Sequence, residues 1–281
     1  MRLLPRTLAA ETVKLALRER VSSGYPIDRP CDIYRTIAKH VTLQFIDVPT
    51  LEGMYLEDVN VRRICICGVR PSGRQRLTGA HELGHLLMGH GTRLDVIEEA
   101  RSNAEETSLE ETLADIFAYH VLMPARAVHT GFTERNLNAR MPAPRTLYAI
   151  ANWLGVGYTA LVQHMRFSLE LLSPDIHKKL LQQNLKSLKS SIVGCETTND
   201  VFELDGLWDG CTLHAEIGDY LLGVCNDHGC DLLTSSQHGI YRISKCGIAK
   251  IPLQSGGTLQ LKVARHHYVG FYDYRYLEEV E

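Results

Sequence analysis

The sequence lacks any long uncharged apolar run. Its first 20 residues interrupt their apolar side chains with seven charged ones, so no signal-peptide core is expected there. Nowhere do about 18 uncharged apolar residues follow one another, so no membrane-spanning helix is expected. The sequence also has eight cysteines. Without a secretory signal, we expect these thiols to be free or metal-bound in a reducing compartment, and the protein to be cytoplasmic.

Neither sign of charge dominates the chain. Thirty Lys and Arg residues stand against 33 Asp and Glu, for a formal net charge of −3. This balance excludes binding of a polyanion through overall charge, so any contact with nucleic acid has to be local. At 44% hydrophobic and 22% charged residues, the 281-residue chain has the composition of a globular protein, and we find no internal repeat or low-complexity tract.

Apolar periodicity predicts an α+β protein built in three parts. The first part, residues 1–123, combines helices with a small sheet. Its helices are expected at 7–22, 31–40, 76–90 and 109–123, and its strands at 41–48 and 61–69.

The second part, residues 124–192, is predicted to be helical, with a helix–turn–helix rhythm at 146–154 and 158–167 and one more helix at 174–190. The third, residues 193–281, has frequent glycine and short alternating segments, which predict an all-β domain. Its expected role is that of a sensor, a docking surface or an oligomerisation element. Aromatic residues near its end, from Tyr268 to Tyr276, are interpreted as sheet packing or, less favoured, an interface.

Five residues, His81-Glu82-Leu83-Gly84-His85, have the spacing of a catalytic zinc site. Two histidines four apart share one face of a helix, so both imidazoles can reach one ion. Glu82 is rotated by about 100° from His81 and suits a base that takes a proton from metal-bound water. The alternative is a helix whose two histidines are unconnected, and the orderly helical context makes that alternative less favoured.

A third ligand has to come from elsewhere in the chain. Glu110 and Glu111, on the helix expected at 109–123, are the best candidates, because an antiparallel neighbour can present a carboxylate to the ion. Spacing alone does not choose between them. His90 misses the third-histidine position of the longer HExxHxxGxxH pattern and is interpreted as a histidine at a helix end.

Two separated motifs resemble the ImmA/IrrE family of metallopeptidases. RQRLTGAHELGHLL at 74–87 is similar to the family pattern RxRFTxAHELGHLLLH, and Glu111 to Pro124 is similar to ExxANxFAxxLLMP, with Leu77 where the family often has Phe. The resemblance covers about residues 28–165. It implies a zincin-like fold with Zn²⁺ held by His81, His85 and Glu111, and with Glu82 as the general base.

The same resemblance implies a role. Members of this family typically cleave a helix–turn–helix transcriptional repressor at one site, which relieves repression in a stress response or a mobile element. The expected partner is therefore a protein substrate, and no membrane is involved. The alternative is a regulator without protease activity that binds DNA or protein through residues 124–192, with zinc as structural support. Nine basic against three acidic residues at 124–190 favour this alternative, but the helix at 158–167 offers few side chains that read bases.

Cysteines and histidines in the third part raise a weaker hypothesis of a second, structural metal site. The candidate ligands are Cys211, His214, Cys225, His228 and Cys230. Their spacings match no recognised zinc finger, and buried free thiols are the favoured interpretation. A thiol-based redox sensor is a third option.

Overall fold

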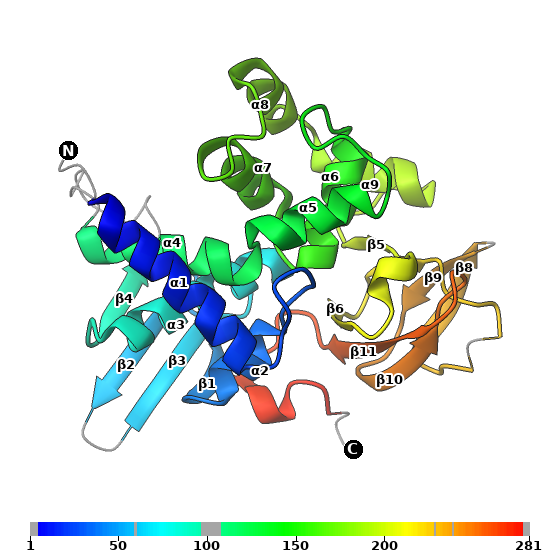
Figure 1. The fold of residues 1–281 in the computed structure, drawn as a ribbon. Helices are drawn as coiled ribbons and strands as arrows, with labels where there is room; N and C mark the ends of the chain where they lie inside the picture. The colour runs from blue at the N-terminus through cyan, green and yellow to red at the C-terminus, as the bar shows by residue number, and fades with distance from the viewer. Residues whose placement is uncertain (1–4, 59–60, 97–107, 228, 238, 278–281) are drawn as a thin grey trace. The chain divides into compact units, whose positions relative to one another are not determined.

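The computed structural model describes residues 5–58, 61–96, 108–227, 229–237 and 239–277. They pack into two compact units (Figure 1). The first comprises Met1–Thr130, Leu154–Val156 and His267–Tyr272, and the second comprises Gly131–Trp153, Gly157–His266 and Asp273–Glu281. Both helices and sheets are present, which confirms the predicted α+β class.

A five-stranded sheet forms one layer of the first unit. Its strands are β1 (Thr42–Ile46), β2 (Leu51–Asp58), β3 (Val61–Cys67), β4 (Arg93–Val96) and β12 (Gly270–Phe271). They lie in the order β12-β1-β3-β2-β4, with β1 and β3 parallel and the other neighbours antiparallel. Strands β1 and β3 match the predicted ones, whereas β2, β4 and the pairing of β12 with β1 were not predicted.

Helices of the first unit cover this sheet and pack on one another. They are α1 (Arg6–Ser22), α2 (Ile33–Ala38), α3 (Ser72–Met88), α4 (Leu109–Leu122) and the first part of α5 (Ala125–Thr133), within which the unit boundary falls. Helix α3 packs on β2, β3, α2 and α4, and α4 packs on α1 and α3. Leu83 of α3 and Phe117 of α4 are fully buried, so apolar burial holds these two helices together.

The second unit combines four helices with two small sheets. The helices are α6 (Pro144–Leu154), α7 (Tyr158–Phe167), α8 (Pro174–Leu181) and α9 (Leu185–Val193). One sheet has the order β10-β11-β6 and the other the order β5-β7-β9-β8. Their strands are β5 (Val201–Glu203), β6 (Thr212–Glu216), β7 (Tyr220–Leu222), β8 (Leu233–Gln237), β9 (Ile240–Ile243), β10 (Gly247–Pro252) and β11 (Thr258–Ala264).

The single helix predicted at 174–190 is wrong. Two helices occupy this segment because Asn184 starts a new one: its side chain accepts a hydrogen bond from the backbone N–H of Ser187. The preceding helix, α8, begins at its own cap, Ser173, followed by Pro174 at the first helical position.

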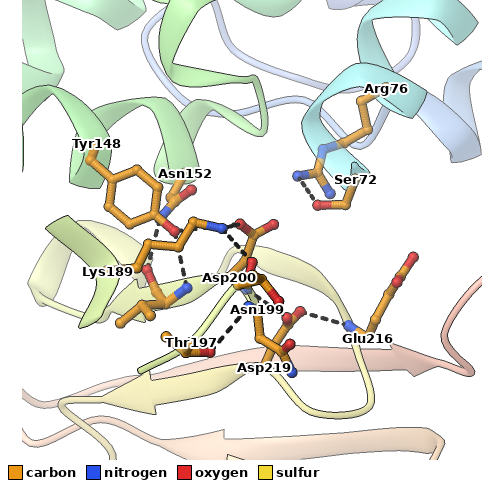
Figure 2. Close-up of polar contacts among 12 residues, drawn as sticks. Ser72, Arg76, Tyr148, Asn152, Lys189, Thr197, Asn199, Asp200, Glu216 and Asp219 are labelled. Carbon is orange, nitrogen blue, oxygen red and sulfur yellow. Dashed lines mark hydrogen bonds and ion pairs between the residues drawn. The ribbon is translucent and has the colours of Figure 1, made fainter. Parts of the chain in front are cut away.

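A polar junction joins α6 and α9 to the β strands within the second unit (Figure 2). The Tyr148 hydroxyl accepts from the backbone N–H of Val201 at 3.0 Å, and Lys189 Nζ lies 2.9 Å from Asp200 Oδ1. Asp219 accepts from the backbone N–H groups of Asp200 and Glu216, each at 2.9 Å. Burial raises the pKa of the Asp219 carboxyl. These contacts hold helices and strands in one compact unit.

The division into domains at residues 1–123, 124–192 and 193–281 stays a prediction. By packing, the boundary between the two units falls in α5, and residues 267–272 near the C-terminus belong to the first unit. Among the described residues, no helix combines the length and apolar character needed to cross a membrane.

Candidate metal centre

Helix α3 presents the HExxH motif on a buried face. The helix follows Pro71 and ends at Gly89, which takes the left-handed conformation, with φ 69° and ψ 36°. His81 and His85, one turn apart, are 8% and 1% exposed. Both imidazoles are thus held in a largely water-free layer, where a neighbouring polar group interacts strongly.

The first turn of helix α4 lies next to these histidines. Ser108 caps it, accepting a hydrogen bond from the backbone N–H of Glu111 at 3.2 Å. Ser108 and Glu111 have the spacing of a capping box, in which the third-position Glu often turns back to the cap. Here the Glu111 carboxylate instead faces the two imidazoles of α3.

A glycine lets α3 and α4 approach closely enough for this contact. A Cβ placed at Gly84 would lie 3.3 Å from the Ala114 Cα and 3.2 Å from Phe117 Cδ1. Since Gly84 lies between the two histidines and Ala114 follows Glu111 by one turn, the closest packing of the helices falls beside the polar side chains.

His81, His85 and Glu111, here called the ligand group, converge on one point. The Nε2 atoms of His81 and His85 are 3.0 Å apart. The Glu111 carboxylate oxygens lie 3.1 Å from His81 Nε2 and 3.5 Å from His85 Nε2. One potential ligand atom from each residue lies within 4.8 Å of the others, so the group can hold a metal ion. Two imidazole nitrogens and one carboxylate oxygen match the donors of a catalytic zinc with an open fourth position.

Electrostatics in the ligand group favour a protonated imidazole beside an ionised carboxylate. Burial lowers the pKa of His81, but hydrogen bonds with Asp115 and Glu111 outweigh it and raise that pKa to about 10. Hydrogen bonds with His81 and His85 hold the pKa of Glu111 well below its usual range.

Two residues that sequence analysis did not place in the site contact the outer nitrogens of the ligand histidines. Asp115 Oδ1 lies 2.9 Å from His81 Nδ1, and His90 Nδ1 lies 2.9 Å from His85 Nδ1. Asp115 follows Glu111 by four residues, and this spacing on one helix face was the signal in the sequence. Such contacts orient the rings of metal ligands and fix which nitrogen carries the proton.

Glu82 lies beside the ligand group on α3 and is fully buried. A Cβ placed at Gly53 of β2 would lie 3.1 Å from Glu82 Oε1 and 2.4 Å from the Thr78 side chain. Glycine at position 53 therefore lets β2 pass close to the side chains of Thr78 and Glu82. Of the two candidates for the third ligand, the structure brings Glu111 to the histidines, and Glu110 is not part of the group.

The second predicted metal site is not assembled in the part of the chain that the structure describes. Cys211, His214, Cys225 and Cys230, here called the β-module set, do not form a group of potential ligands. His214 Nδ1 instead lies 2.7 Å from the Tyr276 hydroxyl. His228, the fifth candidate, lies outside the described residues.

Basic side chains of the predicted helix–turn–helix region face carboxylates within the second unit. Arg135 pairs with Asp205 at 2.7 Å and Arg145 with Glu203 at 2.5 Å. Lys189 lies 2.9 Å from Asp200, and Lys186 pairs with Glu196. Four of the nine basic residues at 124–190 are thereby neutralised, which reduces the local attraction for phosphate.

Comparisons with known proteins bear on this site. A family model, described as the IrrE N-terminal-like domain of a peptidase family, matches residues 40–165. Among solved structures, a Mycobacterium tuberculosis transcriptional regulator is similar at 14% identity and a TM-score of 0.38, over 56% of this chain and 46% of that chain. The similarity thus spans less than half of the regulator's length. No curated protein matches the chain.

The matched segment includes both helices of the ligand group and the strands on which α3 packs. Its order of elements, strand then HExxH helix then a second helix with a glutamate at its start, brings three potential metal ligands together. The match of residues 40–165 to the IrrE N-terminal-like family model supports a metallopeptidase of the ImmA/IrrE family.

Proposed function

We propose that the protein is a cytoplasmic zinc-dependent endopeptidase that cleaves a helix–turn–helix transcriptional repressor at one site, in a stress response or a mobile element. The observation that carries this proposal is the convergence of the ligand group within 4.8 Å, with the buried Glu82 next to it on α3. The family match of residues 40–165 supports a metallopeptidase. The repressor as substrate rests on the family resemblance.

In this proposal His81, His85 and Glu111 would hold Zn²⁺, because their two Nε2 atoms and a carboxylate oxygen face one another. The ion supplies Lewis acidity and lowers the pKa of a bound water to about 7. Glu82 takes one proton from the attacking water as its oxygen bonds to the scissile carbonyl carbon. Glu82 then gives that proton to the leaving amine nitrogen when the C–N bond breaks.

Glu82 suits this role because of its surroundings. It is fully buried against β2, so its carboxylate is shielded from bulk water. A carboxylate in such a place exchanges protons with a bound water and not with solvent. A purely structural zinc needs no such neighbour and is usually closed by a fourth Cys or His.

The regulator alternative, with residues 124–192 binding DNA, is less favoured. The pairing of Arg135, Arg145, Lys186 and Lys189 with acidic residues leaves fewer cations for phosphate contacts. Specific, salt-sensitive operator binding that survives removal of zinc would restore this alternative.

The test compares wild type with Glu82→Gln. Both proteins are purified without added metal, zinc is counted by elemental mass spectrometry, and purified helix–turn–helix repressors are offered as substrates. We expect about one zinc per chain in both proteins, single-site cleavage by wild type, and a rate about 10²–10⁴-fold lower in the variant. A variant that cleaves at the wild-type rate would overturn the mechanism, and a wild type without zinc would overturn the proposed metal centre.

A further inference from the structure

The C-terminal cap of α3 reaches into the metal centre. His90 lies just outside the helix, yet its Nδ1 is 2.9 Å from Nδ1 of the ligand residue His85. The two rings are 5.0 Å apart between centroids and inclined at 69°. This is an edge-on approach of one imidazole nitrogen to the other, so the contact is a hydrogen bond and not a stacking of ring faces.

Backbone geometry places His90 at this position. Gly89 is left-handed, its N–H bonds to the Leu86 carbonyl at 3.2 Å, and the N–H of His90 bonds to the His85 carbonyl at 3.1 Å. These two bonds define a Schellman motif, in which the residue after the glycine contacts the residue five positions earlier. That contact is usually hydrophobic. Here it joins a half-buried histidine to a ligand of the proposed metal.

The chemistry of the ligand requires an acceptor at this point. If His85 binds a metal through Nε2, its proton has to be on Nδ1. His85 is only 1% exposed, so this N–H needs a partner within the protein. The nitrogen within hydrogen-bonding distance is His90 Nδ1, which accepts when His90 is neutral and carries its own proton on Nε2.

We infer that His90 is a positioning residue of the metal centre, which the Schellman motif at the end of α3 holds against His85 so that His85 Nε2 faces the ion. This inference rests on the proposed zinc site and adds to it. His81 has the equivalent arrangement with Asp115, at 2.9 Å between His81 Nδ1 and Asp115 Oδ1. Each ligand histidine thus has its own partner, one from the following helix and one from the cap of its own helix.

Two nearly isosteric substitutions separate positioning from packing. In His90→Asn, the side-chain oxygen occupies the place of Nδ1 and can still accept from His85. In His90→Leu, the shape is similar but the acceptor is lost. Leucine suits the hydrophobic contact of a Schellman motif, so the cap itself should persist in His90→Leu.

The measurement is the zinc dissociation constant of the full chain, by competition with a chelating dye at one fixed pH, together with thermal unfolding of the metal-free proteins. We expect His90→Leu to raise the dissociation constant about 10–100-fold and His90→Asn to change it less than about threefold. The metal-free unfolding midpoint of His90→Leu should be no lower than that of wild type.

Three results would overturn the inference. Equal weakening by Leu and Asn would mean that the imidazole acts by its own shape, and wild-type affinity in His90→Leu would mean that the hydrogen bond does not position His85. A wild type that binds no zinc would overturn the proposed function and this inference together. Zinc binding by wild type with an unaffected His90→Leu variant overturns this inference alone.

Discussion

Two regions of the molecule carry residues suited to bind metal. Among the described residues, only the ligand group brings these side chains close together. The ligand group on α3 and α4 brings its three donor atoms within 4.8 Å of one another. The β-module set forms no such group among the residues that the structure describes. Both regions had been selected from spacings in the sequence, so the difference lies in what the local structure does with each spacing.

A spacing of four residues on a helix places two side chains on one face, because 3.6 residues complete a turn. His81 and His85 gain their proximity from this periodicity alone. In the second unit, Cys211 directly precedes β6 and His214 lies within it. Three positions apart along extended backbone, two side chains point to opposite faces. Short Cys and His spacings are therefore informative only when the element beneath them is known.

Removing one ligand from each region tests this comparison most strongly. We expect His81→Ala to lose the single zinc of the purified protein, and Cys225→Ser to keep it, since only the first change removes a member of the ligand group. Elemental mass spectrometry gives the count. A second zinc that survives in His81→Ala and disappears in Cys225→Ser would contradict the distinction between the two regions.

The contact between Asp115 and His81 has a smaller expected effect. In Asp115→Ala, the zinc dissociation constant should rise about tenfold, at the lower end of effects for such partners. The reason is that the Asp115 side chain is 58% exposed, so water can replace it at His81 Nδ1. Competition with a chelating dye measures the change, and Asp115→Asn, which keeps an acceptor oxygen, is the control. An unchanged constant in Asp115→Ala would show that this contact does not support the ligand.

Proton release should accompany zinc binding at the ligand group. The pKa of His81 in the metal-free protein is about 10, so this residue is protonated at every pH below that value. Zinc has to displace that proton, and zinc affinity should therefore increase about tenfold per pH unit until the pH reaches the pKa. Calorimetry at pH 6.5, in two buffers of different ionisation enthalpy, should show at least one proton released. Binding without proton release would mean that the metal does not bind His81.

The ion pair of Arg145 and Glu203 in the second unit gives the smallest expected effect. Its Arg side chain is 57% exposed, and exposed pairs contribute about 0–1 kcal/mol. Arg145→Ala should therefore lower the free energy of unfolding by less than about 1 kcal/mol, as measured by urea denaturation, and leave zinc binding unchanged. A loss of several kcal/mol would contradict the expectation that this exposed ion pair contributes little to the free energy of unfolding.

Sequence periodicity could predict helices α1 to α4 because their signals are local. Gly89 marks the end of α3, and the Ser108 side chain caps the start of α4. The ligand histidines were predicted for the same reason, since their proximity depends on one helix. The choice of Glu111 over Glu110 depends on how α4 is rotated against α3. Spacing in the sequence does not determine that rotation, so the choice came from the family resemblance.

Features that depend on distant contacts could not be predicted in this way. Strand β2 has no apolar alternation, and its third residue, Gly53, allows the close approach to α3. Strand β12 has two residues, and its place is set by pairing with β1, more than 200 residues away in the sequence. The contact of His90 with His85 was missed because its signal is the conformation of Gly89 and not a ligand spacing.

The pairing of β12 has a practical consequence for any attempt to isolate the part that the family model matches. Gln44 and Phe45 of β1 lie opposite Phe271 and Gly270, while the Tyr268 ring packs edge-on against Phe45. A fragment ending at residue 165, where the family match stops, would expose the outer edge of β1 to solvent and to other chains. Aggregation of such a fragment would therefore reflect the loss of strand β12 and would not be evidence against the proposed peptidase function. A second polypeptide that includes residues 267–272, supplied in trans, would restore the pairing of β12 with β1.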